Sequence, residues 1–318
     1  MREVLGMIKR VLRKARVTQP LNFLATSTVR GVLDILGIRP AFVVRHLHRA
    51  GTTRCRLPNG RVLKLWSRGD DWVSTQIYWR GLSGYEPETV PVFLRLAAYA
   101  RVIFDVGAYV GFYTVLAALA NPSARVYAFE PHTNAYERLL RNVRINHLVN
   151  VECLRAAVGE TEGASELFCG PGWLPTSSSL SAEFMSPHGV LRGMSVQVVS
   201  LDAFIRNSGI ERVDLLKIDT ESTEPQILRG MLETLRRDRP SIICEVLRGR
   251  GAEDRLESIL GGLGYHYYLL TPTGPMRVPR VTGHEAWLNY LFTCSDLDAP
   301  ASHLGMSHPR TSSLRARD

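Results

Sequence analysis

Residues 102–113 read VIFDVGAYVGFY, an apolar run that carries one acid, Asp105, followed by two glycines, Gly107 and Gly111. With the apolar residues after it, the run is long enough to resemble a membrane span. A spanning helix seldom holds an acid beside two glycines, because a charge is costly in the bilayer and glycine weakens a helix. We therefore predict a buried strand that ends at Asp105, a glycine turn and the start of a helix.

From residue 101 onward, the chain alternates between strand-like and helix-like segments. Seven segments have the composition of strands: RVIFDVGA, RVYAFEP, NVECLRAAVG, VDLLKIDT, PSIICEVL, YHYYLLT and WLNYLFTC. Helical stretches are predicted between them at 112–120, 133–146, 224–236 and 252–263. This alternation predicts an α/β fold with a doubly wound, mostly parallel seven-stranded sheet that helices cover on both faces.

The sequence suggests three parts. Residues 1–100 are predicted to form an N-terminal extension of helices and a hairpin, whose strands alternate around a Pro-Asn-Gly turn in RCRLPNGRVLKLW. Residues 101–296 form the main domain, and its Gly-, Pro- and Ser-rich insertion at about 160–195 has the loop composition of a substrate lid. The polar, aperiodic tail, 297–318, is expected to be disordered.

Composition sets broad limits on the class of protein. The 318 residues are 45% hydrophobic, which allows a sizeable core. Five cysteines lie far apart without a C-x-x-C pair, and no secretory signal is evident, so we expect reduced thiols, no structural zinc and a cytoplasmic protein. The net charge of +9 is compatible with nucleic acid, an acidic membrane surface or an anionic substrate, and it selects none of them.

The chain begins MREVLGMIKRVLRKARV, a pattern that predicts an amphipathic helix with a strongly basic side. One interpretation is a helix that rests on an anionic membrane, which would give the protein a peripheral membrane contact. The other is a helix that packs on the domain and keeps its basic side in water, and we favour this second interpretation.

Acids at the ends of the first two predicted strands indicate a nucleoside cofactor. In an open α/β sheet the ligand lies beyond the carboxyl ends of the strands. Asp105 ends the first strand, and Glu130 ends the second, nineteen positions after Gly111. Glu130 can accept hydrogen bonds from the ribose hydroxyls. Because the turn lacks the G-x-G that suits a diphosphate, we predict S-adenosylmethionine, which has no phosphate and whose amino group Asp105 would hold.

Several stretches, in this order along the chain, resemble the FkbM family of S-adenosylmethionine-dependent methyltransferases. They are IFDVGAYVGFYT, VYAFEPHTNAYERLLRNVRIN, VSLDAFI, VDLLKIDTESTEPQILRG and RPSIICEV. The resemblance runs from about residue 82 to about residue 294. It implies the Rossmann-like class I methyltransferase fold and O-methylation of a hydroxyl, with a sugar, glycan or secondary metabolite as the acceptor.

Matching the motifs position by position implies two sets of site residues. The cofactor-binding set is Asp105, Gly107, Tyr109, Gly111, Glu130, Ala157 and Glu86. The catalytic candidates at the ends of the fourth and fifth strands are Asp219, Glu221 and Glu245. Two roles stay open for these acids: one removes the proton of the acceptor hydroxyl, or they fix Lys217 and the start of the next helix. For Glu86, helix capping is the alternative to a contact with the cofactor.

Two departures from the family pattern bear on activity. The family usually has Asn where this chain has Tyr109, and Gly-Ala where it has Ser222 and Thr223. Tyr tolerates a left-handed backbone less well than Asn, so we expect a strained or differently shaped loop. A methyltransferase fold that has lost catalysis and acts as a binding module is therefore a second hypothesis. A nucleotide-dependent oxidoreductase is a third, which the missing G-x-G-x-x-G disfavours.

The sequence gives only weak evidence for a metal site and for a nucleic-acid substrate. The carboxylates of DTESTE could hold a magnesium ion that binds a diol, but we rank this chemistry low and predict no metal site. DTES also stands where amino-group methyltransferases of nucleic acid carry D/N-P-P-Y. Because basic and aromatic residues do not interleave, nucleic acid is not expected as the substrate. No sequence feature fixes the oligomeric state.

Overall fold

The structure is a computed structural model that describes residues 19–38, 41–175, 177–185 and 192–298. The predicted basic helix at the start of the chain lies outside the described residues, as does the predicted tail from residue 299 onward. In the described part of the chain, no helix combines the length and the apolar character needed to cross a bilayer.

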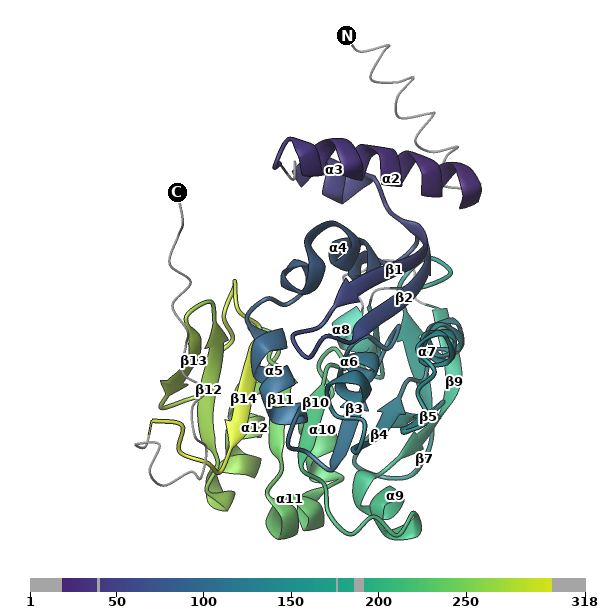
Figure 1. The fold of residues 1–318 in the computed structure, drawn as a ribbon. Coiled ribbons are helices and arrows are strands. Elements are labelled where there is room, and N and C mark those ends of the chain that lie inside the picture. Colours follow the sequence, from purple (N-terminus) through teal and green to yellow (C-terminus); the bar gives the residue numbers. More distant parts are fainter. Residues whose placement is uncertain (1–18, 39–40, 176, 186–191, 299–318) are drawn as a thin grey trace.

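A central eight-stranded sheet organises the main domain, with the strand order β13-β12-β14-β11-β10-β3-β4-β5 (Figure 1). Its strands are β3 (Val102–Val106), β4 (Arg125–Phe129), β5 (Val151–Leu154), β10 (Leu215–Ile218), β11 (Ser241–Glu245), β12 (His266–Thr271), β13 (Gly274–Val278) and β14 (Asn289–Thr293). Strands β5, β4, β3, β10 and β11 are parallel neighbours, whereas β14 runs antiparallel to β11 and β12. The order reverses between β3 and β10, and this reversal opens a crevice at the carboxyl ends of the strands.

The predicted doubly wound α/β sheet is thus confirmed, and each of the seven predicted strands contributes to it. The sheet is mixed and has eight strands rather than seven, with four parallel and three antiparallel pairings. The added strand, β13, pairs only with β12 and lies at the edge of the sheet. It includes Pro275, which an edge strand tolerates because the missing N–H need not pair with a neighbouring strand.

Helices cover both faces of the sheet. One face carries α5 (Thr89–Ala97), α6 (Phe112–Ala120) and α7 (Thr133–Ile145), and the other carries α9 (Leu201–Asn207), α10 (Glu224–Arg229), α11 (Leu232–Asp238), α12 (Glu253–Leu260) and the 3-10 turn Gly261–Leu263. Ile103 packs into the α5–α6 core and its neighbour Phe104 into the opposite core, as the alternation of a strand requires.

The single helix predicted over 224–236 is wrong, because the chain breaks it into α10 and α11 at Gly230. A Cβ at Gly230 would lie 2.2 Å from the carbonyl oxygen of Gly159. The break therefore lets the start of the insertion approach the backbone of this helical segment closely.

The insertion at about 160–195 is also different from the predicted loop. It belongs to a second, four-stranded sheet of order β6-β9-β7-β8, made of β6 (Ala157–Val158), β7 (Gly163–Cys169), β8 (Ser178–Ser179) and β9 (Arg192–Val199), with α8 (Ala182–Met185) beside it. β7 pairs with β9 along its whole length, and Leu167 and Cys169 are buried in a small core of their own. The loop-like composition is confined to the segment between β7 and α8.

The N-terminal extension consists of α2 (Gln19–Ile35), α3 (Ala41–His46), the hairpin of β1 (Ala50–Arg56) and β2 (Val62–Arg68), α4 (Trp72–Arg80) and the 3-10 turn Gly81–Gly84. The predicted hairpin is confirmed, and Asp71 caps α4 by accepting the N–H of Ser74 at 2.6 Å. The hairpin is fastened to α7, since the N–H of Trp66 donates to Asn142 Oδ1 at 2.7 Å. In Figure 1, α2 and α3 lie beyond the hairpin, apart from the central sheet.

Candidate active site

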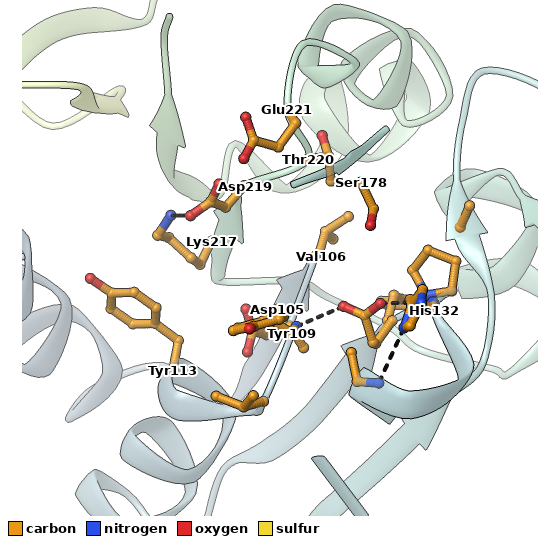
Figure 2. A pocket seen from close by; sticks show the side chains of 18 of the residues that line it. Asp105, Val106, Tyr109, Tyr113, His132, Ser178, Lys217, Asp219, Thr220 and Glu221 are labelled. Atoms are coloured by element: carbon orange, nitrogen blue, oxygen red, sulfur yellow. Dashed lines mark hydrogen bonds and ion pairs between the residues drawn. The ribbon is translucent and has the colours of Figure 1, made fainter. Parts of the chain in front are cut away.

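A cavity of about 240 Å³ opens at the carboxyl ends of the parallel strands. Its lining includes every predicted site residue except Gly111: Glu86, Asp105, Gly107, Tyr109, Glu130, Ala157, Asp219, Glu221 and Glu245. Figure 2 shows Glu221 on the same side of the cavity as Lys217 and Asp219, with His132 on the opposite side. The topology therefore brings both predicted sets together in one cavity, and their individual roles stay predictions.

Gly111 is absent from this lining and instead packs against α7. Its φ of +83° places it in the left-handed region at the start of α6, and a Cβ there would lie 2.5 Å from Leu139 Cδ1 of α7. Gly111 therefore permits the close contact between α6 and α7, and its role toward the cofactor stays a prediction.

Gly107 directly follows β3 and lies against Asp219, the residue that follows β10. Its φ is +81°, and a Cβ would lie 1.9 Å from the carbonyl oxygen of Asp219. Gly107→Ala should lower the free energy of unfolding by about 3 kcal/mol, because the added methyl group combines a backbone clash with a disfavoured φ. Urea unfolding measures this loss. Gly60→Ala is the matched control, since its φ is +83° with no atom within 4 Å of the added Cβ; an equal loss in both variants would show that the contact with Asp219 contributes nothing.

Glu130 is a buried carboxylate held by two backbone groups. The N–H of Tyr109 donates to its Oε2 at 2.7 Å, and the N–H of His132 donates to its Oε1 at 2.8 Å. Burial raises the pKa of Glu130 to about 7, although both backbone donors act in the opposite direction. Each oxygen keeps a second lone pair, so the group can still accept hydrogen bonds from two neighbouring hydroxyls.

Asp105 lies deeper in the same crevice. Its Oδ2 accepts a hydrogen bond from Thr114 Oγ1 of α6 at 2.5 Å, and it pairs in register with Lys217 of β10. Burial raises the pKa of Asp105 to about 6, opposed by the hydrogen bond from Thr114 and by the charge of Lys217. The side chain thus links β3 to α6 through Thr114 and also lines the cavity.

A buried lysine lies at the centre of the acidic end of the cavity. Lys217 Nζ is 3.2 Å from Asp219 Oδ2 and 5.2 Å from the ring centre of Tyr113 (Figure 2). Burial alone would lower the pKa of Lys217, but the nearby carboxylates, led by Asp219, outweigh it and raise that pKa. The lysine therefore stays charged and holds Asp219 in place. This contact is compatible with either predicted role of Asp219.

The two other catalytic candidates carry raised pKa values. Burial, followed by repulsion from Asp219, raises the pKa of Glu221 to about 8 and that of Glu245 to about 10. Both groups therefore hold a proton at neutral pH. Among the described residues, the buried Oε2 of Glu245 has no hydrogen-bond partner. A polar group that enters the cavity can supply that partner.

Glu86 closes the cavity from the N-terminal extension. Its Oε2 accepts hydrogen bonds from Tyr113 Oη at 2.7 Å and from Asn289 Nδ2 at 3.0 Å. Both of these partners are side chains, so the two hydrogen bonds do not cap a helix, which was the alternative role considered for Glu86. Tyr113 and Asn289 were not predicted, because a tyrosine in an apolar helix and a lone asparagine at a strand start carry no motif.

Strained backbone is concentrated around this cavity. In the described part of the chain, six non-glycine residues have a positive φ, and four of them lie in its loops: Glu86 (+41°), Tyr109 (+50°), Glu221 (+58°) and Ser222 (+84°). The strained, left-handed backbone expected at Tyr109 is therefore present, and Ser222, at the second departure, shares it. Such strain tends to occur at functional sites. Tyr109 lines the cavity without closing it.

Ser222 combines this strain with a buried hydroxyl that has no partner among the described residues. Ser222→Gly should raise the free energy of unfolding by about 1 kcal/mol, because glycine adopts the left-handed region freely and removes the unpaired hydroxyl. Urea unfolding is the measurement, and Ser222→Ala, which keeps the strain, is the control. A stabilisation of Ser222→Ala equal to that of Ser222→Gly would contradict a strain effect.

Glu221 should make the stability of the ligand-free protein depend on pH. Its pKa is about 8 in the folded protein against an ordinary 4.5, so the folded state binds the proton more tightly. The free energy of unfolding should therefore fall as pH rises from about 5 to 8. Glu221→Gln should reduce this fall by about 1–3 kcal/mol. Urea unfolding at several pH values tests the prediction, and identical pH profiles for the two proteins would contradict it.

Comparison with known proteins places this cavity in a family context. The model of the methyltransferase FkbM domain matches residues 105–291, more than half of the chain. The chain is 27% identical over 241 residues to 31-O-demethyl-FK506 methyltransferase FkbM of Streptomyces tacrolimicus, covering 66% of this chain and 87% of that protein. It is 26% identical over 189 residues to methyltransferase sdnD of Sordaria araneosa, covering 51% and 73%.

Two further similarities have a lower sequence identity. The chain is 25% identical over 156 residues to hexuronic acid methyltransferase AglP of Haloferax volcanii, covering 49% of this chain and 60% of that protein. Among solved structures, methyltransferase FkbM from Methylobacillus flagellatus aligns with a TM-score of 0.42 at 16% identity, over 70% of this chain and 55% of that one.

Proposed function

Because the chain belongs to the FkbM family of methyltransferases, we propose that it transfers a methyl group to a hydroxyl of a sugar, glycan or secondary metabolite. It is an S-adenosylmethionine-dependent methyltransferase with the class I fold. The proposal concerns the acceptor, and it rests on the acidic end of the cavity.

The cavity residues fit the cofactor. Glu130 offers two carboxylate oxygens at the end of β4 for the ribose hydroxyls, and Gly107 keeps the β3 turn free of a side chain beside the strand ends. Asp105 supplies negative charge near the turn for the cationic amino group. When bound, S-adenosylmethionine supplies an electrophilic methyl group on a sulfonium. The protein must then orient the acceptor and accept its proton.

Charge in the cavity favours a hydroxyl acceptor over a carboxylate. Three further carboxyl groups, Glu86, Glu221 and Glu245, lie with the Lys217–Asp219 pair in the lining. An acceptor carboxylate would be buried without an unpaired cation among the described lining residues, because Lys217 is already paired with Asp219, and burying an unpaired charge is costly. A hydroxyl enters as a neutral hydrogen-bond donor. This pairing of Lys217 with Asp219 is the observation that carries the proposal.

Asp219 is our choice for the proton acceptor. Lys217 keeps it in an ion pair, whereas the raised pKa values of Glu221 and Glu245 leave those groups protonated at neutral pH. With S-adenosylmethionine bound, the acceptor oxygen would take the methyl group from the sulfonium and S-adenosylhomocysteine would leave. Asp219 would accept the proton of the hydroxyl. Glu245 can hold the acceptor by a hydrogen bond.

Two relatives support a small or sugar-like acceptor. One acts on 31-O-demethyl-FK506 and another on hexuronic acid, as their names state. The first name states an oxygen as the site of methylation, and the second states a sugar acid without giving the site. The relatives therefore support the acceptor class without selecting a compound.

The chemistry of the product tests this proposal. The protein is incubated with methyl-labelled S-adenosylmethionine and two matched acceptor sets, neutral polyhydroxylated compounds and uronic acids. We expect labelled products that resist mild alkali, because a methyl ether is stable where a methyl ester releases methanol. Alkali-labile products formed only from the uronic acids would contradict a hydroxyl acceptor. Tight S-adenosylhomocysteine binding without turnover on any acceptor would instead favour the binding-module hypothesis.

A further inference from the structure

The outward side of α2 is apolar and carries no charge. Positions 24, 28, 31, 32 and 35 share this side at helical spacing, and they are Leu24, Thr28, Gly31, Val32 and Ile35, the outer stripe. All five are exposed, with exposed fractions of 65% for Leu24, 51% for Val32 and 86% for Ile35. Leu36, Ile38 and Phe42 extend the exposed apolar surface toward α3. Contiguous exposed apolar surface of this kind marks an interaction site.

The opposite side of α2 is fastened firmly to the extension. Asn22 donates to the carbonyl of His48 at 2.9 Å and accepts the N–H of Ala50 at 2.7 Å. The guanidinium of Arg49 donates to Thr26 Oγ1 at 2.7 Å, and Leu33 is buried. Because polar contacts fix the inner side, the outer stripe cannot turn inward to bury itself. Its exposure is thus a consequence of how the helix is anchored.

Positive charge is concentrated in the same part of the chain. Residues 1–56 contain twelve basic and two acidic residues, a net charge of +10, whereas the whole chain carries +9. The remaining 262 residues are therefore close to neutral. Among residues 1–56, the structure describes five basic residues and one acidic residue. An excess of basic residues in the segment that holds an uncharged apolar stripe is typical of a surface that binds anionic lipid. Nucleic acid would match the charge but would leave the stripe exposed to water.

We propose that the outer stripe docks on an anionic lipid surface, with α2 lying in the plane of the headgroups. Apolar side chains enter the boundary of the acyl chains, and the basic residues of the extension meet the lipid phosphates. The same extension reaches the cavity, because Trp72 of α4 is a lining residue; its ring lies 6.4 Å from the ring of His48, centre to centre. This inference is independent of the acceptor proposed above.

Vesicle binding by the full chain tests this inference. Vesicles of phosphatidylcholine with about a third phosphatidylglycerol are compared with pure phosphatidylcholine in a flotation assay. The full chain should bind the anionic vesicles at least about tenfold more tightly and lose binding in high salt. The triple variant Leu24→Ser, Val32→Ser and Ile35→Ser should bind them about a hundredfold more weakly, because three inserted side chains are lost.

A matched triple variant controls for general loss of surface hydrophobicity. It replaces three exposed apolar residues elsewhere, Tyr99→Ser, Val149→Ser and Met276→Ser, and should bind like the unmodified chain. S-adenosylhomocysteine affinity and the unfolding midpoint verify that the stripe variant is folded, which is expected since the replaced side chains are exposed. Absent vesicle binding by the full chain, or unchanged binding by the stripe variant, would overturn the inference. Self-association that the stripe variant abolishes, without vesicle binding, would show that the stripe joins two copies instead.

Discussion

Glu130→Ala is expected to weaken the binding of S-adenosylhomocysteine by about a hundredfold or more. The change removes the acceptor for the proposed ribose hydroxyls and leaves the backbone N–H groups of Tyr109 and His132 without their partner. A hydrogen bond to a charged group contributes about 1.5–3 kcal/mol, and tenfold in affinity corresponds to about 1.4 kcal/mol. Isothermal titration of the variant and the unmodified protein measures the difference.

Two variants define the cause of that loss. Glu130→Gln keeps one carbonyl acceptor and should bind with an affinity between those of the unmodified protein and Glu130→Ala. Glu137→Ala, which removes an exposed carboxylate seven residues away on α7, should change nothing. An affinity of Glu130→Ala within about threefold of the unmodified protein would place the ribose elsewhere.

Asp219→Asn is expected to lower kcat by about 10² to 10⁴ while cofactor affinity changes little. Asn keeps the shape of the side chain but cannot accept the hydroxyl proton. The change also removes the ion pair with Lys217, whose other acidic neighbours, Glu86 and Glu245, remain. Single-turnover transfer with methyl-labelled cofactor measures the effect, and titration with S-adenosylhomocysteine measures affinity in parallel.

Asp214→Asn is the matched control for β10. Asp214 lies just before the opposite end of this strand and accepts the N–H groups of Arg101 and Val102, which an asparagine oxygen can also accept. Its transfer rate should stay near that of the unmodified protein. A scaffold role for Asp219 would appear as a loss of affinity and stability in Asp219→Asn with an almost unchanged rate of transfer. That outcome would decide between the two roles that the sequence left open.

The sheet could be predicted from local sequence because its strands are buried on both faces. VIFDV, RVYAF and LLKI are nearly continuous apolar runs followed by turns, and such runs occupy the centre of a parallel sheet. The break between α10 and α11 could not be predicted from local sequence, since Gly230 lies against the backbone of Gly159, a residue 71 positions earlier. The pairing of β7 with β9 likewise depends on contacts across a long loop.

The candidate site divides in the same way. Asp105, Glu130, Asp219 and Glu245 could be predicted because each ends or follows a strand, and neighbouring parallel strands end at the same edge of a sheet. Trp72 and the Tyr113–Glu86–Asn289 contacts could not, because three distant segments meet there only in the folded chain. Gly111 was assigned to the cofactor on sequence, whereas its contact with Leu139 becomes evident only from the packing of α7.

Isothermal titration of the unmodified protein with S-adenosylhomocysteine tests the central claim most directly. An intact cofactor cavity at the ends of β3 and β4 predicts one site per chain with micromolar affinity, a binding free energy of about −8 kcal/mol. Binding at this level, lost in Glu130→Ala and kept in Asp219→Asn, would confirm that the cavity separates cofactor binding from proton removal. No heat of binding up to millimolar ligand would contradict the account, because the cavity bordered by Tyr109 would then not admit the cofactor.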